Sequence, residues 1–208
     1  LRAALSRGAR IFAPTDVVHV DEHARGIVAI TRRGQRIRAR QAVLATGYEV
    51  FKGLEARGHS LQSTWVIATK PQPRALWPGQ CLIWEASDPY LYLRTTSDGR
   101  VLCGGGDEPF VDAAKRDALS AQKFGFLRRR LERLFPQLDA EPTHAWAGTF
   151  GTSATGTPLI GRLPGKRRLF TVLGCGGNGI TFSMLAAQLL RALLLGEPDR
   201  DAELFAPR

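Results

Sequence analysis

A glycine-rich segment near the C-terminus is the part of this 208-residue sequence best suited to bind a ligand. Residues 174–179 read Gly-Cys-Gly-Gly-Asn-Gly, between an apolar run at 169–173 and a long apolar segment that begins at Ile180. The spacing is G-x-G-x-x-G, whose bare backbone lets a phosphate or another electron-rich group approach the N–H groups at a helix N-terminus. Tight packing of helix on strand is the alternative use of these glycines, but Asn178 and Thr181 add polar groups that packing does not require.

The residues after this segment argue against a dinucleotide-binding Rossmann unit. Such a unit needs a second parallel strand, with an acidic residue roughly 20 residues further on. Asp199 and Asp201 fall near that distance, but they lie in a short tail with no strand pattern. The segment therefore predicts a helix N-terminus that faces an electron-rich group, and not the start of a dinucleotide fold.

The cysteines form neither a metal-binding nor a disulfide pattern. Cys81, Cys103 and Cys175 are far apart, with no C-x-x-C pair and no pair of histidines nearby. Zinc sites and disulfide frameworks both use closely spaced residues in sets. We expect no metal and three reduced thiols, as in a cytoplasmic protein.

The net charge of +10 does not by itself indicate a nucleic-acid partner. Basic residues cluster at 32–40, 128–133 and 166–168, but the clusters lie far apart and contain no aromatic residue. Binding to nucleic acid needs one basic face, with exposed aromatics where bases stack. We interpret the clusters as solvated faces and expect no nucleic-acid partner.

The most apolar segment, Ile180–Leu195, is shorter than the roughly 20 residues that a membrane-spanning helix needs. It also contains Gln188 and Arg191. We therefore expect a buried helix here and no membrane partner.

The remaining pattern predicts a mixed α/β chain. Apolar residues recur at spacings of three and four between Phe124 and Leu134, which predicts an amphipathic helix over 112–135 that ends at Pro136. Asp98-Gly99 predicts a hairpin turn, and Arg33-Gly34 predicts another. Strands are expected at 10–20, 26–31, 35–38, 42–45, 65–69, 81–84, 90–95, 101–103, 145–150 and 169–173, with a second helix at 180–195.

Several segments, taken in order, resemble one enzyme family. Residues 161–164, 169–174 and 177–181 (Gly-Arg-Leu-Pro, Leu-Phe-Thr-Val-Leu-Gly and Gly-Asn-Gly-Ile-Thr) are similar to the C-terminal end of FAD-dependent amine and amino-acid oxidoreductases. Residues 8–17 and 43–47 resemble two internal strands of the FAD domain, and 92–102 resembles the hairpin of the substrate domain. The family is the D-amino-acid oxidase superfamily, which includes glycine oxidase and sarcosine oxidase. The resemblance extends over essentially the whole chain.

The resemblance implies an α/β (α+β) fold, with a partial FAD-binding domain and an antiparallel-sheet substrate domain. Residues 1–60 and 151–208 would belong to the FAD-binding domain, and 61–150 to the substrate domain. The implied reaction oxidises the C–N bond of a small-molecule amine or amino acid by hydride transfer to the flavin. Val17 would contact the adenine through its backbone, and 176–181 would face the flavin pyrimidine. The residues implied to bind FAD are Val17, Ala45, Thr46, Gly47, Gly176, Gly177, Asn178, Gly179, Ile180 and Thr181.

The sequence departs from the family where the substrate would bind. Glycine-oxidase-type members have an Arg for the substrate carboxylate where this chain has Phe150, and a second where it has Gly177. Their absence puts a small α-amino carboxylate in doubt and favours an amine or a larger amino compound. Tyr92 and Arg94 are further candidate substrate contacts, with a core tyrosine and a solvated arginine as the alternatives. No catalytic residue is identified.

Two features that the family uses have no counterpart in the sequence. The strand expected at 101–103 lacks the lysine with which sarcosine-oxidase-type members activate oxygen, which leaves the electron acceptor open. Members also begin with a Rossmann turn for the FAD pyrophosphate, and nothing resembling that turn lies near Leu1. We expect either a piece of a longer flavoenzyme or an inert chain that needs a separate FAD-binding segment or chain. Either would leave apolar surface exposed on the last helix.

Overall fold

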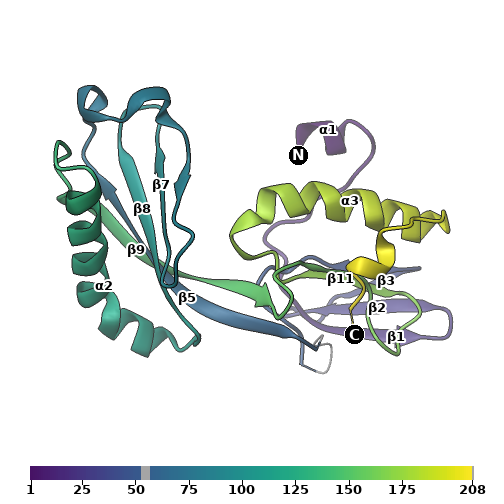
Figure 1. The fold of residues 1–208 in the computed structure, drawn as a ribbon. Helices are drawn as coiled ribbons and strands as arrows, with labels where there is room; N and C mark the ends of the chain where they lie inside the picture. The colour runs from purple at the N-terminus through teal and green to yellow at the C-terminus, as the bar shows by residue number, and fades with distance from the viewer. Residues whose placement is uncertain (53–56, 208) are drawn as a thin grey trace. The chain divides into compact units, whose positions relative to one another are not determined.

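The computed structural model describes residues 1–52 and 57–207, and these form two compact units. Unit 1 comprises Leu1–His59 and Thr157–Arg208, and unit 2 comprises Ser60–Gly156. Both units combine helix and sheet (Figure 1), which confirms the predicted mixed α/β (α+β) fold. The assignment of the units to cofactor and substrate stays a prediction.

Unit 1 packs one helix and two sheets on one another. Strands β10 (Leu159–Arg162), β11 (Leu169–Leu173) and β4 (Ala42–Leu44) form a sheet in that order, and α3 (Gly179–Leu195) covers one face of it (Figure 1). The second sheet is antiparallel and contains β1 (Val17–His23), β2 (Gly26–Thr31) and β3 (Arg36–Ala39). Side chains alternate across β11: Phe170 packs under α3, whereas Leu169 packs with residues of β1 and β2.

The N-terminal part of unit 1 agrees only in part with the prediction. The hairpin of β2 and β3 turns at Arg33-Gly34 as expected, with Gly34 at φ +80°. The strand predicted over 10–20 is wrong in its first half, because β1 begins only at Val17. The Arg32 N–H still donates to the Asp16 carbonyl at 2.8 Å, but Pro14 has no N–H group with which to extend the ladder further.

Unit 2 is a five-stranded sheet with one long helix against it. Its strands lie in the order β6 (Ile83–Trp84), β7 (Leu91–Thr95), β8 (Val101–Glu108), β5 (His59–Thr69) and β9 (Pro142–Ser153). The helix α2 (Ala113–Leu134) packs on the sheet through Leu127 and Leu131, which are fully buried (Figure 1). Asp112 caps α2, as its side chain accepts a hydrogen bond from the Lys115 backbone N–H at 2.7 Å. The predicted helix over 112–135 is therefore confirmed.

Some strands are longer than their sequence pattern predicts, and β10 was not expected. The extra residues of β5, β8 and β9 include many Gly, Ser and Thr, which have no strong apolar alternation of their own. Pairing with distant strands decides their conformation. The remaining elements are short: α1 (Arg2–Leu5), η1 (Pro73–Ala75), η2 (Pro78–Gln80), η3 (Gly176–Asn178) and η4 (Ala202–Leu204).

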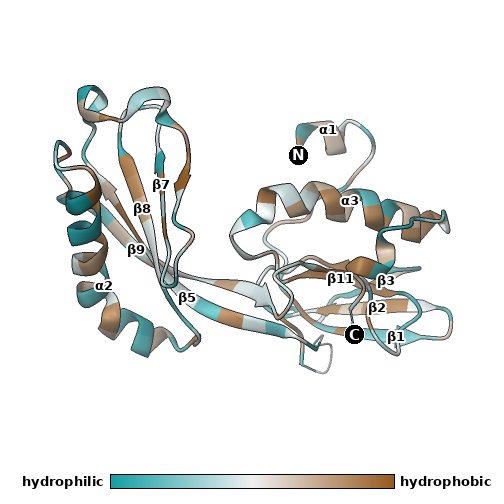
Figure 2. Ribbon diagram, in the orientation of Figure 1, coloured by the Kyte–Doolittle hydropathy of each residue, from teal (hydrophilic) through white to brown (hydrophobic). Residues whose placement is uncertain are grey.

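Helix α3 carries many apolar residues (Figure 2), but it is less buried than that apolar sequence predicts. Leu189 and Leu190 pack on the sheet, but Ile180 is 94% exposed and Met184 is 64% exposed. The expectation of a buried helix is therefore wrong for its first two turns, whereas exposed apolar surface on this helix was expected. By length and composition alone, Gly176–Leu195 could cross a membrane, and no other helix in the described residues could. Soluble core helices pass the same test.

The contact between α2 and the sheet supplies the first testable prediction. We expect Leu131→Ala to lower the free energy of unfolding by about 2–5 kcal/mol, because it leaves a cavity in a fully buried position. Leu134→Ala, one turn later at a side chain that is 42% exposed, is the matched control and should cost well under half as much. Urea denaturation followed by circular dichroism measures both values. Equal losses in the two variants would contradict this packing.

Candidate functional site

The glycine-rich segment joins β11 directly to α3, as the sequence predicts. Gly174, at φ +68°, ends the strand, and Gly176, at φ +53°, begins the short turn η3. Both conformations favour glycine. The N-terminus of α3 carries no side-chain cap, so no capping side chain satisfies its first backbone N–H groups. An uncapped helix N-terminus is attractive to an electron-rich group.

At two of these positions, neither backbone conformation nor packing among the described residues requires a glycine. A Cβ atom placed on Gly177 or Gly179 would meet no atom within 4 Å, and neither residue has a positive φ. Close helix–strand packing, the alternative use of these glycines, would instead bring atoms near these Cβ positions. The open space leaves room for an external group.

The carboxyl end of β4 lies at the same end of the sheet as the carboxyl end of β11, where the glycine-rich segment begins. β4 and β11 are parallel, with Leu44 opposite Thr171, and the Thr171 hydroxyl donates to the Leu44 carbonyl at 3.3 Å. Because the strands are parallel, the residues that follow them leave the sheet at one edge, where open α/β sheets bind ligands. The structure thus brings Ala45, Thr46 and Gly47 to the edge from which residues 174–181 also leave. The Thr46 hydroxyl donates to the Glu49 carbonyl, and this bond holds the turn after β4.

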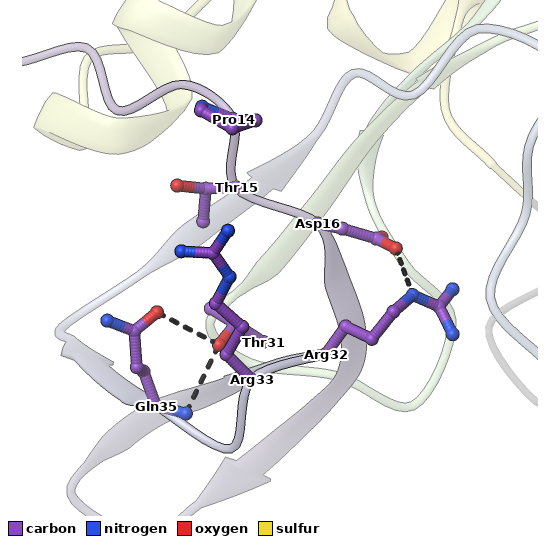
Figure 3. Close-up of a pocket in the computed structure, with 7 residues that line it drawn as sticks. All are labelled: Pro14, Thr15, Asp16, Thr31, Arg32, Arg33 and Gln35. Atoms are coloured by element: carbon purple, nitrogen blue, oxygen red, sulfur yellow. Dashed lines mark hydrogen bonds and ion pairs between the residues drawn. The ribbon is translucent and has the colours of Figure 1, made fainter.

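Val17, the remaining predicted cofactor residue, lies at the start of β1 in the other sheet of unit 1 and packs on the core that includes Leu44. The three residues before it, Pro14, Thr15 and Asp16, line a cavity of about 410 Å³ (Figure 3). This cavity lies between the segment before β1 and the turn that links β2 to β3, and Arg33 extends across it toward Thr15. Arg32 turns away and pairs with Asp16, its Nε 2.6 Å from Oδ2.

The basic cluster at 32–40 was interpreted from the sequence as a solvated face, and Arg33 is indeed exposed. Nothing in the sequence indicates the cavity itself, because it forms only where two separate segments meet. The residues that line it are Pro14, Thr15, Asp16, Thr31, Arg32, Arg33 and Gln35.

The candidate substrate residues lie in unit 2 on two separate strands. Tyr92 and Arg94 are on β7, whereas Phe150 is on β9, and β8 and β5 lie between these strands. Tyr92 is tightly packed: a Cβ atom on Gly104 would lie 2.2 Å from its ring, so only glycine fits there. Burial raises the pKa of Tyr92, which keeps its hydroxyl protonated. Arg94 is exposed, in line with the solvated alternative.

A polar pair that the sequence does not single out lies beside these residues. The Tyr90 hydroxyl donates to Asp107 Oδ2 at 2.7 Å, and burial together with this carboxylate raises the pKa of Tyr90 well above its usual value. Both side chains line a second cavity of about 410 Å³ within unit 2. The only sequence signal is that Tyr90 and Tyr92, two residues apart, share one face of a strand. The partner Asp107 comes from β8 and becomes visible only once the strands pair.

Known proteins with similar sequences are oxidoreductases. The family described as FAD dependent oxidoreductase (DAO) matches residues 1–193. The chain is 28% identical over 202 residues to gamma-glutamylputrescine oxidoreductase of Escherichia coli, which covers 93% of this chain and 45% of that protein. It is 26% identical over 199 residues to glycine oxidase of Bacillus licheniformis, covering 95% and 52%. The chain thus spans about half the length of the curated relatives it matches.

Solved structures agree on the fold. The crystal structure of iminodiacetate oxidase from a Chelativorans species superposes with a TM-score of 0.82 at 23% identity, covering 100% of this chain and 56% of that one. Glycine oxidase from Geobacillus kaustophilus superposes with a TM-score of 0.78 at 24% identity, covering 99% and 55%. The family match over residues 1–193 defines the class of protein, which is an oxidoreductase that depends on FAD. The chain belongs to the family of FAD-dependent oxidoreductases.

The three cysteines provide a test of the packing of both units, because the exposure of the thiol differs among them. Burial raises the pKa of Cys103 to about 12 and also raises the pKa of Cys175, whereas Cys81 is exposed. Only the thiolate reacts with Ellman's reagent. We expect Cys81 to react first in the native protein, Cys175 more slowly, and Cys103 only after unfolding.

Absorbance at neutral pH records these phases, and Cys81→Ser should remove the fastest one and leave the others unchanged. A rapid reaction of Cys103 in the folded chain would contradict its burial between α2 and the sheet.

Proposed function

We propose that this chain is part of an FAD-dependent enzyme that oxidises the C–N bond of an amine or amino acid. Unit 1 would hold the cofactor and unit 2 would contact the substrate. The observation that carries the proposal is that the parallel strands β4 and β11 end at the same end of the sheet. There, an uncapped helix N-terminus and glycines without side chains leave room for an external group. Bound FAD would accept a hydride from the carbon next to the substrate nitrogen.

The residues of unit 1 suit the electronic demands of a flavin. A flavin gains negative charge on its pyrimidine side when it is reduced, and the positive end of a helix dipole stabilises such charge by roughly 0.3–2 kcal/mol. The segment Gly176–Thr181, which comprises Gly176, Gly177, Asn178, Gly179, Ile180 and Thr181, would supply that helix end. Ala45, Thr46 and Gly47 would lie against the cofactor, and Val17 would meet the adenine through its backbone.

The residues at the expected substrate positions are more consistent with an amine or a larger amino compound as the substrate than with glycine. Phe150 cannot offer the two parallel N–H donors with which Arg binds a carboxylate, and Gly177 offers no side chain at all. Among the relatives, the name of the Escherichia coli enzyme indicates a gamma-glutamyl derivative of a diamine, whereas others act on glycine. We favour the first kind of substrate for this chain.

The cofactor proposal is tested by filling the open space beside the helix. Gly177→Leu should leave the fold intact, because a Cβ atom there meets nothing within 4 Å, but its side chain would occupy the space assigned to the flavin. We expect FAD to shift the NMR amide signals of residues 17, 45–47 and 176–181 in the parent chain, and Gly177→Leu to weaken FAD binding about tenfold or more.

The matched control is Gly148→Leu, at a glycine of unit 2 whose Cβ position is equally open. It should bind FAD like the parent. Equal FAD affinity in all three proteins, or signals that move only outside the named segments, would refute the placement of the flavin. A chain that shows no FAD binding at all would support the alternative that it is inert without a separate FAD-binding chain.

The substrate proposal is tested by restoring the missing arginine. Phe150→Arg should increase affinity for a small carboxylate such as acetate about threefold or more, since a charged hydrogen-bond donor replaces a ring. Phe150→Leu, which keeps the position apolar, should leave acetate binding as weak as in the parent. NMR titration of each purified chain gives the affinities. Acetate binding by the parent as tight as by Phe150→Arg would count against the exclusion of small carboxylates.

A further inference from the structure

We propose that the cavity of unit 2 beside Tyr90 and Asp107 binds a positively charged alkylammonium group of the substrate, with Asp107 as the residue that selects it. This inference rests on the proposed function, because it assigns the class of substrate to that enzyme. The cavity measures about 410 Å³ and is formed within unit 2 alone. The residues that line it are Gln62, Ser87, Asp88, Pro89, Tyr90, Asp107, Glu108 and Pro109.

The pairing of β7 with β8 builds the Tyr90–Asp107 pair. Leu91 lies opposite Gly105, and a Cβ atom on Gly105 would be only 2.3 Å from the Tyr90 carbonyl oxygen. The absence of a side chain therefore lets the two strands approach at this point. The approach brings the Tyr90 hydroxyl to 2.7 Å from Asp107 Oδ2, so the carboxylate is oriented by a bond from the neighbouring segment.

Asp107 still has an unused oxygen. Its Oδ1 atom is buried and has no hydrogen-bond partner among the residues that the structure describes. A buried carboxylate oxygen normally has a donor or a cation beside it, because the loss of hydration is otherwise uncompensated. The unpartnered oxygen leaves this carboxylate able to accept a hydrogen bond from a donor that is not part of this chain.

The charges around the cavity favour a cation as that donor. Three carboxylates line it and no Lys or Arg does, although the chain as a whole has a net charge of +10. Lys123 already pairs with Glu108, with Nζ 2.7 Å from Oε1. Within the described residues, neither Asp88 nor Asp107 has an ion pair. The negative charge left uncompensated in the cavity is thus that of these two aspartates.

The chemistry of the cavity favours an organic ammonium over a metal ion. No group of three or more His, Cys, Asp or Glu in residues 1–52 and 57–207 has the arrangement of a metal site. The ring of Tyr90 lines the cavity and is held edge-on by Trp84, with ring centroids 5.7 Å apart. An aromatic ring and a carboxylate together are well suited to an alkylammonium, which an ion pair and a cation–π contact both stabilise.

The test uses the full chain without FAD, and n-butylamine as the probe. At neutral pH this amine is a cation, and n-butanol is its neutral counterpart of nearly equal size. We expect n-butylamine to shift the NMR signals of the residues that line the cavity, and n-butanol not to. Asp107→Asn should weaken binding of n-butylamine about tenfold or more, because the charge is removed and the shape is kept. Asp117→Asn, at a side chain of α2 that is 75% exposed, is the control and should bind like the parent.

A second variant keeps the result interpretable if Asp107→Asn fails to fold. Tyr90→Phe retains the charge but removes the bond that orients it, and we expect a smaller loss, about threefold. Unchanged affinity in both variants, or equal binding of n-butanol and n-butylamine, would overturn the inference. Because this titration contains no flavin, binding of amine without binding of FAD would contradict only the placement of the flavin on this chain and would leave the role of Asp107 intact. Binding of FAD without binding of amine would contradict only the role of Asp107.

Discussion

The parallel pairing of β4 with β11 is the contact on which unit 1 depends. It joins residues 42–44 to 169–171, which are separated in sequence by the whole of unit 2. Closing so long a loop costs conformational entropy, and burial on both faces of the sheet offsets that cost. Leu169 and Leu173 are buried on one face and Phe170 on the other. The same pairing also makes the candidate site, because it brings the ends of both strands to one edge.

Backbone conformation then shapes that edge more than side chains do. Gly174 and Gly176 adopt positive φ values that turn the chain from strand into helix, whereas Gly177 and Gly179 leave open space at the first turn of α3. A site of this kind offers N–H groups and a helix dipole, which do not depend on the identity of neighbouring side chains. It is suited to a large cofactor with hydrogen-bond acceptors at its rim, as in the family to which the chain belongs.

Local signals in the sequence were sufficient for features that depend on nearby residues. The Asp98-Gly99 turn forms with Gly99 at φ +84°, and α2 ends just before Pro136, as predicted. Features that depend on distant partners could not be predicted. β10 is only four residues long and becomes a strand by pairing with β11. The strand expected at 10–20 is a different case, because its first half fails at Pro14, a local signal that the apolar pattern of the segment outweighed in the prediction. The apolar sequence of α3 predicts a buried helix, but Ile180 and Met184 are exposed. The prediction fails there because periodicity reports how apolar a helix is and not what covers it.

The same distinction separates the two candidate sites. A site made of backbone groups is formed by consecutive residues, so the glycines of 174–179 can be recognised from the sequence alone. A side-chain site formed across strands has no such signature. Neither Tyr90 nor Asp107 stands out in the sequence until the register of β7 on β8 brings the Tyr90 hydroxyl to 2.7 Å from Asp107 Oδ2. A change of one residue in that register would turn Asp107 to the opposite face of the sheet. Under our proposals, cofactor binding depends on local backbone conformation, and substrate selection depends on strand register. A substitution such as Asp107→Asn can therefore change the preferred substrate without disturbing the residues that would hold the flavin.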